Sequence, residues 1–285
     1  MDFISPAEIK RIASRYGFVF KKGLGQNFLS SQSVLEKIAD AAEIENEGVI
    51  EIGPGFGVLT NELAKRAEKV LALEIDDRLI PILRDTLSEY DNVKVINNDV
   101  LKTDIAELIK NEFGDKRVSV AANLPYYITT PIITSLIENR LPLKNLVVMI
   151  QKEVADRITA QPGTKDYGAL SLAVQYYAKP QIVANVPPNC FMPRPNVGSA
   201  VIRLDRYENP PVKVCDEKKM FAIIRAVFNQ RRKTMVNSLS NAPELGIKKE
   251  TITGVLEAMG ETPTVRGETF TLEKFAEFTN RVYEL

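Results

Sequence analysis

The chain has 285 residues, 45% of them hydrophobic and 26% charged, which is long enough for one large globular domain or for a domain and a half. Its 37 basic and 37 acidic residues balance, which taken alone argues against a nucleic-acid partner. The sequence has no histidine, and Cys190 and Cys215 have neither metal-ligand spacing nor a disulfide-rich context. These features exclude Ser-His and Cys-His catalysis and predict that the protein uses no metal.

No stretch approaches the roughly 18–20 apolar residues that span a bilayer. The first ten residues, "MDFISPAEIK", are polar and helix-like and do not resemble a signal peptide. We therefore expect a cytoplasmic protein without membrane contacts, and nothing in the sequence indicates more than a monomer. Basic residues are nevertheless concentrated in 1–30 and in 216–235, either as solvated surface or as binding surface.

The first two thirds of the sequence alternates short apolar strands with amphipathic helices, as in βαβ units with a parallel sheet. The predicted strands are 48–52, 69–76, 93–99, 118–124 and 145–150, and the predicted helices are 32–44, 58–67, 78–87 and 130–139.

The pattern changes after about residue 180. Two strands, 181–188 and 199–206, are predicted to end the sheet as an antiparallel pair, and the segment 207–212 is a proline-rich linker. Helices follow at 217–239, 248–260 and 271–285. We therefore expect a doubly wound α/β domain over 1–206 and a small all-helical domain over 207–285.

Glycine-rich and acidic residues follow the predicted strands where a ligand would lie. Gly53, Gly55 and Gly57 directly follow the first strand, either as a tight turn or as a turn that lets a ligand approach the backbone. Glu74 closes the second strand, where a carboxylate reaches ribose hydroxyls, and Asp99 closes the third, where it can accept a hydrogen bond from adenine.

This glycine turn departs from the dinucleotide fingerprint, because Pro54 separates the first two glycines and the third follows after one residue. A nicotinamide cofactor is disfavoured for that reason. "EIGPGFG", "EID" and "NND" at three successive strand ends instead resemble an S-adenosylmethionine-dependent methyltransferase with a Rossmann-like sheet.

The fourth strand ends in "NLPY", beside the expected methyl donor. An adenine amino group is a poor nucleophile, and it is improved when both of its hydrogens are held by acceptors. The Asn123 side-chain oxygen and the Leu124 carbonyl are the predicted acceptors, and Pro125 biases Leu124 toward an extended backbone. Tyr126 offers a ring on which a flipped-out base stacks.

A second wall of the base pocket is predicted at Phe191, which "PP" and "PRP" flank on an expected exposed, rigid loop. The neighbouring Tyr127 is assigned to the core, as lone aromatic residues usually are.

Five segments in order resemble the small-subunit (16S) rRNA adenine N(6)-dimethyltransferase family of the KsgA type over nearly the whole chain. They are "KKGLGQNFL" (21–29), "EIGPGFG" (51–57), "NLPYYITTPI" (123–132), "FMPRPNVGSAVIRL" (191–204) and "FNQRRKTMVNSL" (228–239). The resemblance implies dimethylation of two adjacent adenosines near the 3′ end of small-subunit rRNA, within an immature 30S-type particle during ribosome biogenesis.

The resemblance also implies roles that the residues alone do not indicate. Asn27 and Leu29 would help to hold the S-adenosylmethionine, alongside Gly53, Gly55, Glu74, Asp99 and Asn123. Lys21, Lys22, Arg231, Arg232 and Lys233 would contact RNA phosphates, with strong salt dependence.

Three alternatives remain at this point. A large-subunit rRNA adenine methylase of the antibiotic-resistance type shares the fold and the "NLPY" chemistry. A DNA adenine methyltransferase usually has proline in place of Leu124 and a dedicated DNA-reading domain. A mainly non-catalytic ribosome assembly factor would bind the subunit without needing Asn123 or the glycine turn.

Overall fold

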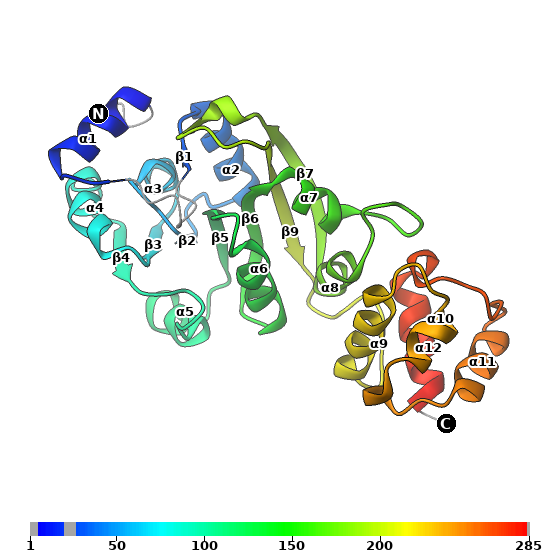
Figure 1. The fold of residues 1–285 in the computed structure, drawn as a ribbon. Helices are drawn as coiled ribbons and strands as arrows, with labels where there is room; N and C mark the ends of the chain where they lie inside the picture. Colours follow the sequence, from blue (N-terminus) through cyan, green and yellow to red (C-terminus); the bar gives the residue numbers. More distant parts are fainter. Residues whose placement is uncertain (1–4, 20–26, 284–285) are drawn as a thin grey trace. The chain divides into compact units, whose positions relative to one another are not determined.

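The computed structural model describes residues 5–19 and 27–283. Contacts divide the chain into two compact units (Figure 1). The first unit contains the residues up to Ala155 together with Lys179–Arg206, and the second contains Asp156–Ala178 together with the residues from Tyr207 onward. Because it contains Asp156–Ala178, the second unit takes in a segment from within the α/β part of the sequence.

The first unit contains a seven-stranded sheet within the described residues, in the order β4-β3-β2-β5-β6-β9-β7. Strands β2 to β6 pair in parallel, and β9 runs antiparallel to β6. The strands are β2 (Gly48–Ile52), β3 (Lys69–Glu74), β4 (Val93–Asn97), β5 (Val118–Asn123), β6 (Leu143–Gln151), β7 (Ala178–Val186) and β9 (Ser199–Arg206). The predicted doubly wound, mostly parallel sheet with an antiparallel final strand is confirmed.

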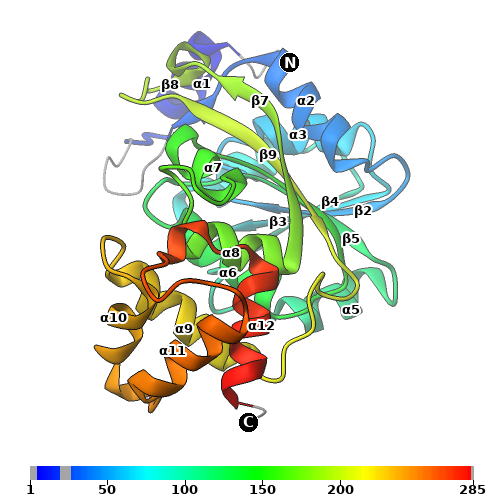
Figure 2. The same cartoon turned by 90° about the vertical axis from the view of Figure 1, so that its right-hand side faces the viewer.

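Helices cover both faces of this sheet, which explains why its central strands β2, β3, β5 and β6 are buried runs, whereas the edge strands β4 and β7 keep exposed residues. Val49, Val70 and Ala121 pack in one core with α2 and α3, while their strand neighbours, such as Ile50 and Leu71, are buried on the opposite face. Figure 2 shows α2 and α3 on one side of the sheet and α6 on the other. The helices of this unit are α1 (Pro6–Arg15), α2 (Gln32–Ala42), α3 (Val58–Ala64), α4 (Ile80–Thr86), α5 (Ile105–Phe113) and α6 (Thr129–Glu138), and α7 (Lys152–Thr159) crosses into the second unit.

A separate two-stranded ladder joins distant parts of the sequence. Strand β1 (Phe28–Leu29) pairs antiparallel with β8 (Phe191–Met192). The ladder is extended by Ser30, whose backbone N–H donates to the Cys190 carbonyl at 2.7 Å. The segments "NFL" (27–29) and "CFM" (190–192) are therefore neighbours, although more than half of the chain separates them.

The second unit is built from helices around one apolar core. They are α8 (Ala169–Tyr177), α9 (Glu217–Asn229), α10 (Met235–Ser240), α11 (Lys249–Ala258) and α12 (Leu272–Tyr283). The predicted helix over 217–239 is interrupted, because Thr234 adopts an extended backbone and caps α10 by accepting from the Asn237 N–H. Tyr167 ties the segment before α8 to this core, since its hydroxyl donates to the Phe270 carbonyl at 2.8 Å.

Neither unit contains a helix, among the described residues, that is both long and apolar enough to cross a membrane.

Glycine is required at one buried position of the second unit. A Cβ at Gly267 would lie 1.9 Å from Cγ1 of Val227, a residue of α9. We expect Gly267→Ala to lower the free energy of unfolding by about 1–3 kcal/mol, as overpacked cores do. Urea denaturation measures this change.

The matched control is Gly254→Ala on α11, where an added Cβ meets no atom within 4 Å. That variant should gain about 0.5–1 kcal/mol from the higher helix propensity of alanine. A Gly267→Ala protein as stable as the wild type would contradict the packing described for α9.

Candidate functional site

A glycine turn follows β2 and opens the site. Gly53, Gly55 and Gly57 have φ angles of +69°, +61° and +84°, in the left-handed region that side chains disfavour. A Cβ at Gly55 would also lie only 2.7 Å from Cε1 of Phe28. The backbone of the turn is therefore bare, and Gly57 leads directly into α3 as its N-cap residue.

Glu74, the last residue of β3, connects the glycine turn to β3 through hydrogen bonds. Its Oε2 accepts a hydrogen bond from the Gly55 N–H at 3.1 Å, and its Oε1 accepts one from the Asp76 N–H at 2.8 Å. Burial raises the pKa of Glu74, while these backbone donors act in the opposite direction. The carboxyl group thus fixes the turn and still has lone pairs for a ligand.

Asp76 and Arg78 attach the N-terminal segment to the same edge of the sheet. The Arg78 Nε donates to Asp76 Oδ1 at 2.7 Å, and the Arg78 guanidinium lies 4.8 Å from the centre of the Phe18 ring. The Phe18 ring in turn packs edge-on against Phe56 of the glycine turn, at 5.3 Å between ring centres. Phe18, near the end of the described residues 5–19, is therefore held against the glycine turn.

Asp99 lies two residues beyond β4. Its Oδ1 accepts from the Leu101 N–H at 3.0 Å, and its Oδ2 lies 3.8 Å from the Lys102 ammonium. Asp99 is not among the residues that line the cavity at this edge.

The Asn123 side chain, at the end of β5, has a defined orientation. Its Nδ2 donates to the Asn27 carbonyl at 2.9 Å. Because a carbonyl can only accept, the amide nitrogen must face Asn27, and the Asn123 oxygen is left as an acceptor. The site thereby contains one oriented acceptor at the strand end.

The "LPYY" turn that follows is fixed by its backbone. The Leu124 N–H donates to the Met149 carbonyl at 3.1 Å, and the Pro125 carbonyl accepts from the Ile128 N–H at 3.2 Å. Within the described residues, no hydrogen bond reaches the Leu124 carbonyl, so it is a second available acceptor.

The two tyrosines of the turn differ in environment. Tyr126 is half-buried, and its hydroxyl lies 2.7 Å from the Ser199 hydroxyl on β9. Burial raises the pKa of the Tyr126 hydroxyl. Tyr127 is 58% exposed, so its assignment to the core is wrong.

One cavity brings most of these residues together. It is lined by Asn27, Phe28, Gly53, Gly55, Glu74, Ile75, Asp76, Leu79, Asn123, Leu124, Pro125, Tyr126 and Tyr127. Five of these were not predicted as site residues from the sequence: Phe28, Ile75, Asp76, Leu79 and Tyr127. The position of Asp76 directly after the "EI" of the second strand was the available signal for that residue.

Two predicted site residues lie beside the cavity and do not line it. Phe191 is 5% exposed and is paired through β8 with Leu29 of β1, which is 4% exposed. The expectation that Phe191 itself is exposed is therefore wrong, because the ladder with β1 buries this ring in the core of the first unit, although Pro187, Pro193 and Arg194 around it are exposed.

The predicted basic residues differ in their surroundings. Arg232 and Lys233 are exposed in the loop between α9 and α10. Arg231 forms an ion pair with Glu268 at 3.2 Å and donates to the Thr164 carbonyl at 3.0 Å, so part of its bonding capacity is used internally. Lys21 and Lys22 lie outside the described residues.

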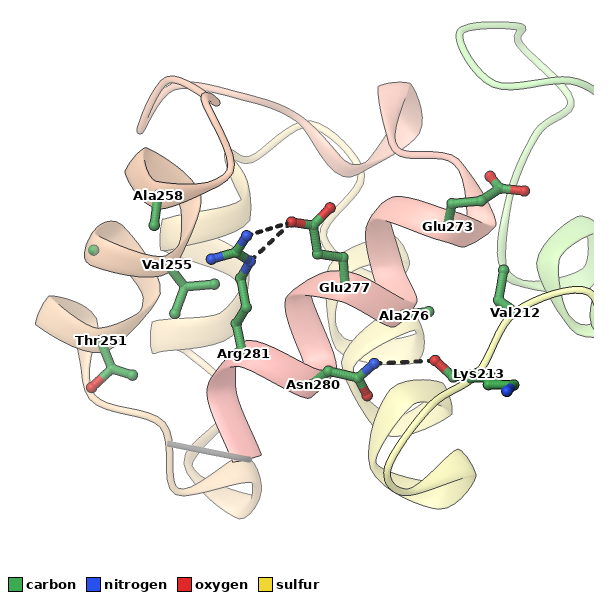
Figure 3. A pocket seen from close by; sticks show the side chains of 11 residues that line it. Val212, Lys213, Thr251, Val255, Ala258, Glu273, Ala276, Glu277, Asn280 and Arg281 are labelled. Atoms are coloured by element: carbon green, nitrogen blue, oxygen red, sulfur yellow. Dashed lines mark hydrogen bonds and ion pairs between the residues drawn. The ribbon is translucent and has the colours of Figure 1, made fainter.

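A larger cavity, of about 840 Å³, lies within the second unit between α11 and α12 (Figure 3). Arg281 and Glu277 form an ion pair at 2.9 Å along α12 at its wall, and Asn280 donates to the Lys213 carbonyl at 3.1 Å. Val255 and Ala276 supply apolar surface. This cavity contains none of the predicted site residues.

The bare glycine turn, the strand-end carboxylate and the strand-end carboxamide, on a sheet with this strand order, define a Rossmann-like methyltransferase. Residues 17–277 match the family model for ribosomal RNA adenine dimethylase. The chain belongs to this family.

Relatives and solved structures agree with this membership. The chain is 57% identical to the ribosomal RNA small subunit methyltransferase A of Lachnoclostridium phytofermentans, over 98% of this chain and 97% of that protein. It is 54% identical to the protein of the same name from Geobacillus thermodenitrificans, over 100% and 98% of the two chains.

Among solved structures, a dimethyladenosine transferase from Plasmodium falciparum has a TM-score of 0.73 at 29% identity, covering 88% of this chain and 95% of that one. The 23S rRNA methyltransferase ErmE has a TM-score of 0.68 at 26% identity, covering 90% and 99%.

One buried carboxyl group near the site has an oxygen atom without a hydrogen-bond partner. Glu51 of β2 is 1% exposed, and its Oε2 has no hydrogen-bond partner in the described part of the chain. Burial raises the pKa of Glu51 from 4.5 to about 8, and the nearby charge of Glu74 acts in the same direction. Glu51 is therefore mostly protonated in the folded protein at neutral pH.

This raised pKa predicts a pH-dependent stability. The folded protein keeps a proton that the unfolded chain releases, so the Glu51 contribution is fully present below pH 4.5 and is lost as pH rises through about 8. We expect Glu51→Gln, which cannot ionise, to be more stable than the wild type above pH 8, in urea midpoints measured between pH 5 and 9.

The control is Glu89→Gln, which removes an exposed carboxylate from the same unit. It should follow the wild-type pH profile. If the urea midpoints of the wild type and of Glu51→Gln fell equally as pH rose from 5 to 9, the protonated state of Glu51 would be refuted.

Proposed function

We propose that this protein dimethylates the exocyclic amino groups of two adjacent adenosines near the 3′ end of small-subunit rRNA, with S-adenosylmethionine as methyl donor. The observation that carries the proposal is the orientation of Asn123, whose side-chain oxygen is left to accept because its nitrogen is held by the Asn27 carbonyl. The family match and the high identity to small subunit methyltransferases support the choice of substrate.

The donor site is proposed at the glycine turn, and its residues fit that ligand. Gly53, where an added Cβ would meet no atom within 4 Å, presents backbone that allows close approach of the methionine part of the donor, whereas Gly55 is covered by Phe28. The Glu74 carboxylate is suited to ribose hydroxyls, and Asp99 to the adenine amino group. Asn27, Leu29 and Asn123 complete the proposed set, of which Asn27 and Asn123 line the cavity with Glu74.

When bound, the donor supplies an electrophilic methyl group on a sulfonium. The work of the protein is to hold the target amino group, whose lone pair is delocalised into the adenine ring. The Asn123 oxygen and the Leu124 carbonyl accept its two hydrogens and so favour the pyramidal, cationic nitrogen of the transition state. The cationic product loses its proton readily, so no general base is needed, consistent with a chain that lacks histidine.

The target base is proposed to stack on Tyr126. The hydroxyl bond to Ser199 fixes this ring at the cavity wall. Phe191 is proposed as the second wall, since its strand β8 is paired with β1, whose Phe28 lines the cavity. A base in a duplex cannot reach this position, so the target must be unpaired or flipped out.

The RNA surface is proposed to include Arg231, Arg232 and Lys233, with Lys21 and Lys22. Arg232 and Lys233 are exposed and suited to phosphate contacts, whereas Arg231 shares its charge with Glu268. The proposed working context is an immature 30S-type particle in the cytoplasm, with the enzyme acting as a monomer.

A large-subunit activity is the alternative, because the ErmE structure also resembles this chain. The deciding experiment incubates the protein with labelled S-adenosylmethionine and with either small or large subunits that lack the modification. We expect label only in small-subunit rRNA, as N(6)-dimethyladenosine at two adjacent positions. Label confined to large-subunit rRNA, or found in duplex DNA instead, would overturn the proposal.

The role of Asn123 is tested by substitution. Asn123→Ala removes one of the two acceptors, and loss of one positioned dipole costs about 100- to 1,000-fold in rate. We therefore expect kcat for methyl transfer to fall by at least that factor while binding to small subunits, measured by co-sedimentation, persists. Persistent binding without transfer would also separate catalysis from any assembly role.

The matched control is Asn139→Ala, at the C-terminal end of α6. The amide nitrogen of Asn139 also donates to a backbone carbonyl, that of Ser135, at 2.8 Å. This variant should leave kcat unchanged. Glu74→Ala should show a different defect, a weaker affinity for S-adenosylmethionine, which calorimetry measures. A normal rate in Asn123→Ala would eliminate the proposed acceptor.

A further inference from the structure

Tyr127 is a large aromatic side chain that remains exposed at the mouth of the cavity. It is 58% exposed, although it lines the same cavity as the half-buried Tyr126. Within the described residues, its ring packs against no other aromatic ring, and its hydroxyl has no hydrogen-bond partner. The fold therefore does not require a tyrosine here for its own packing.

The turn nevertheless fixes the backbone from which this side chain extends. The preceding turn is closed by the Ile128 N–H and the Thr129 hydroxyl, which both donate to the Pro125 carbonyl, at 3.2 and 3.1 Å. Helix α6 begins two residues after Tyr127. An aromatic side chain on such a rigid turn loses little conformational entropy when a flat ligand covers it.

The residues near Tyr127 indicate which flat ligand would cover its ring. Tyr126 is anchored through Ser199 at the cavity wall, where the proposed function places the target base. The donor-side carboxylates, Glu74 and Asp76, lie at the end of β3 and just beyond it, a different strand from the β5 that leads to Tyr127. Tyr127 thus lies next to the target position and toward solvent, where the RNA chain would enter and leave.

We propose that Tyr127 is a substrate-binding residue that stacks on the nucleotide adjacent to the target adenosine. This inference rests on the proposed function. When the target base leaves its stack, its neighbour loses a stacking partner, and an exposed aromatic ring replaces that contact. Since the two target adenosines are adjacent, the ring holds one of them while the other is in the cavity.

Substitutions at Tyr127 test this assignment through the KM for unmethylated small subunits. Tyr127→Phe retains the ring and should behave as wild type. Tyr127→Leu retains an apolar side chain without a ring and should raise this KM about tenfold, which corresponds to about 1.4 kcal/mol, with kcat and the Kd for S-adenosylmethionine unchanged. The Phe variant is the matched control, because a structural role for the hydroxyl would make it defective.

The RNA side of the contact gives a second readout. Small subunits in which either adenosine of the pair is replaced by uridine retain one target each, with a weaker stacking neighbour. For at least one of these subunits, the uridine replacement should raise the KM of the wild-type enzyme. The same replacement should change the KM of the Tyr127→Leu variant little.

Additive effects of the protein and RNA substitutions in both subunits would overturn the inference. It would also be overturned by a wild-type KM in Tyr127→Leu, or by a change confined to the donor Kd. These failures differ from failure of the proposed function, in which the wild-type enzyme itself would not methylate small subunits.

Discussion

The Asn123 side chain donates to the Asn27 carbonyl across 96 positions of the chain. This hydrogen bond joins the end of β5 to the residue before β1, and it leaves the Asn123 oxygen as the acceptor. The contacts around the glycine turn continue from the same connection between β5 and β1. Phe28, the next residue, packs on Phe56 at 4.7 Å and closely covers Gly55, whose N–H is held by Glu74. Donor and target positions are thus set by one connected group of contacts.

Most of the sheet could be predicted from the sequence because both of its faces are covered, so each central strand is a mostly apolar, buried run bounded by turn residues. Strand β9 was predicted with the observed limits, Ser199–Arg206. Three helices, α5, α7 and α8, were not predicted. Helix α8 passes directly into β7 at Ala178 without a loop, and Pro180, the nearest signal for its end, already lies inside β7.

The site was predictable where a strand end dictates a position, and less so where distant segments meet. Glu74 and Asn123 are the last residues of their strands, so their place at one edge of the sheet follows from parallel pairing. The burial of Phe191 depends on a two-residue ladder with β1, which periodicity cannot detect in strands this short. The exposure of Tyr127 depends on the turn geometry, since the sequence alone does not distinguish the two neighbouring tyrosines.

The discontinuous second unit has a consequence for synthesis of the protein. Helix α8 is translated well before α9 and α12, which cover its buried residues Leu172 and Tyr176. At typical elongation rates, the last of these partners follows about 5–20 seconds later. During that interval the apolar face of α8 has no native cover, while β7 and β9, made soon after α8, can already complete the sheet. The nascent chain therefore exposes a temporary binding surface for chaperones, which disappears only when α12 has left the ribosome.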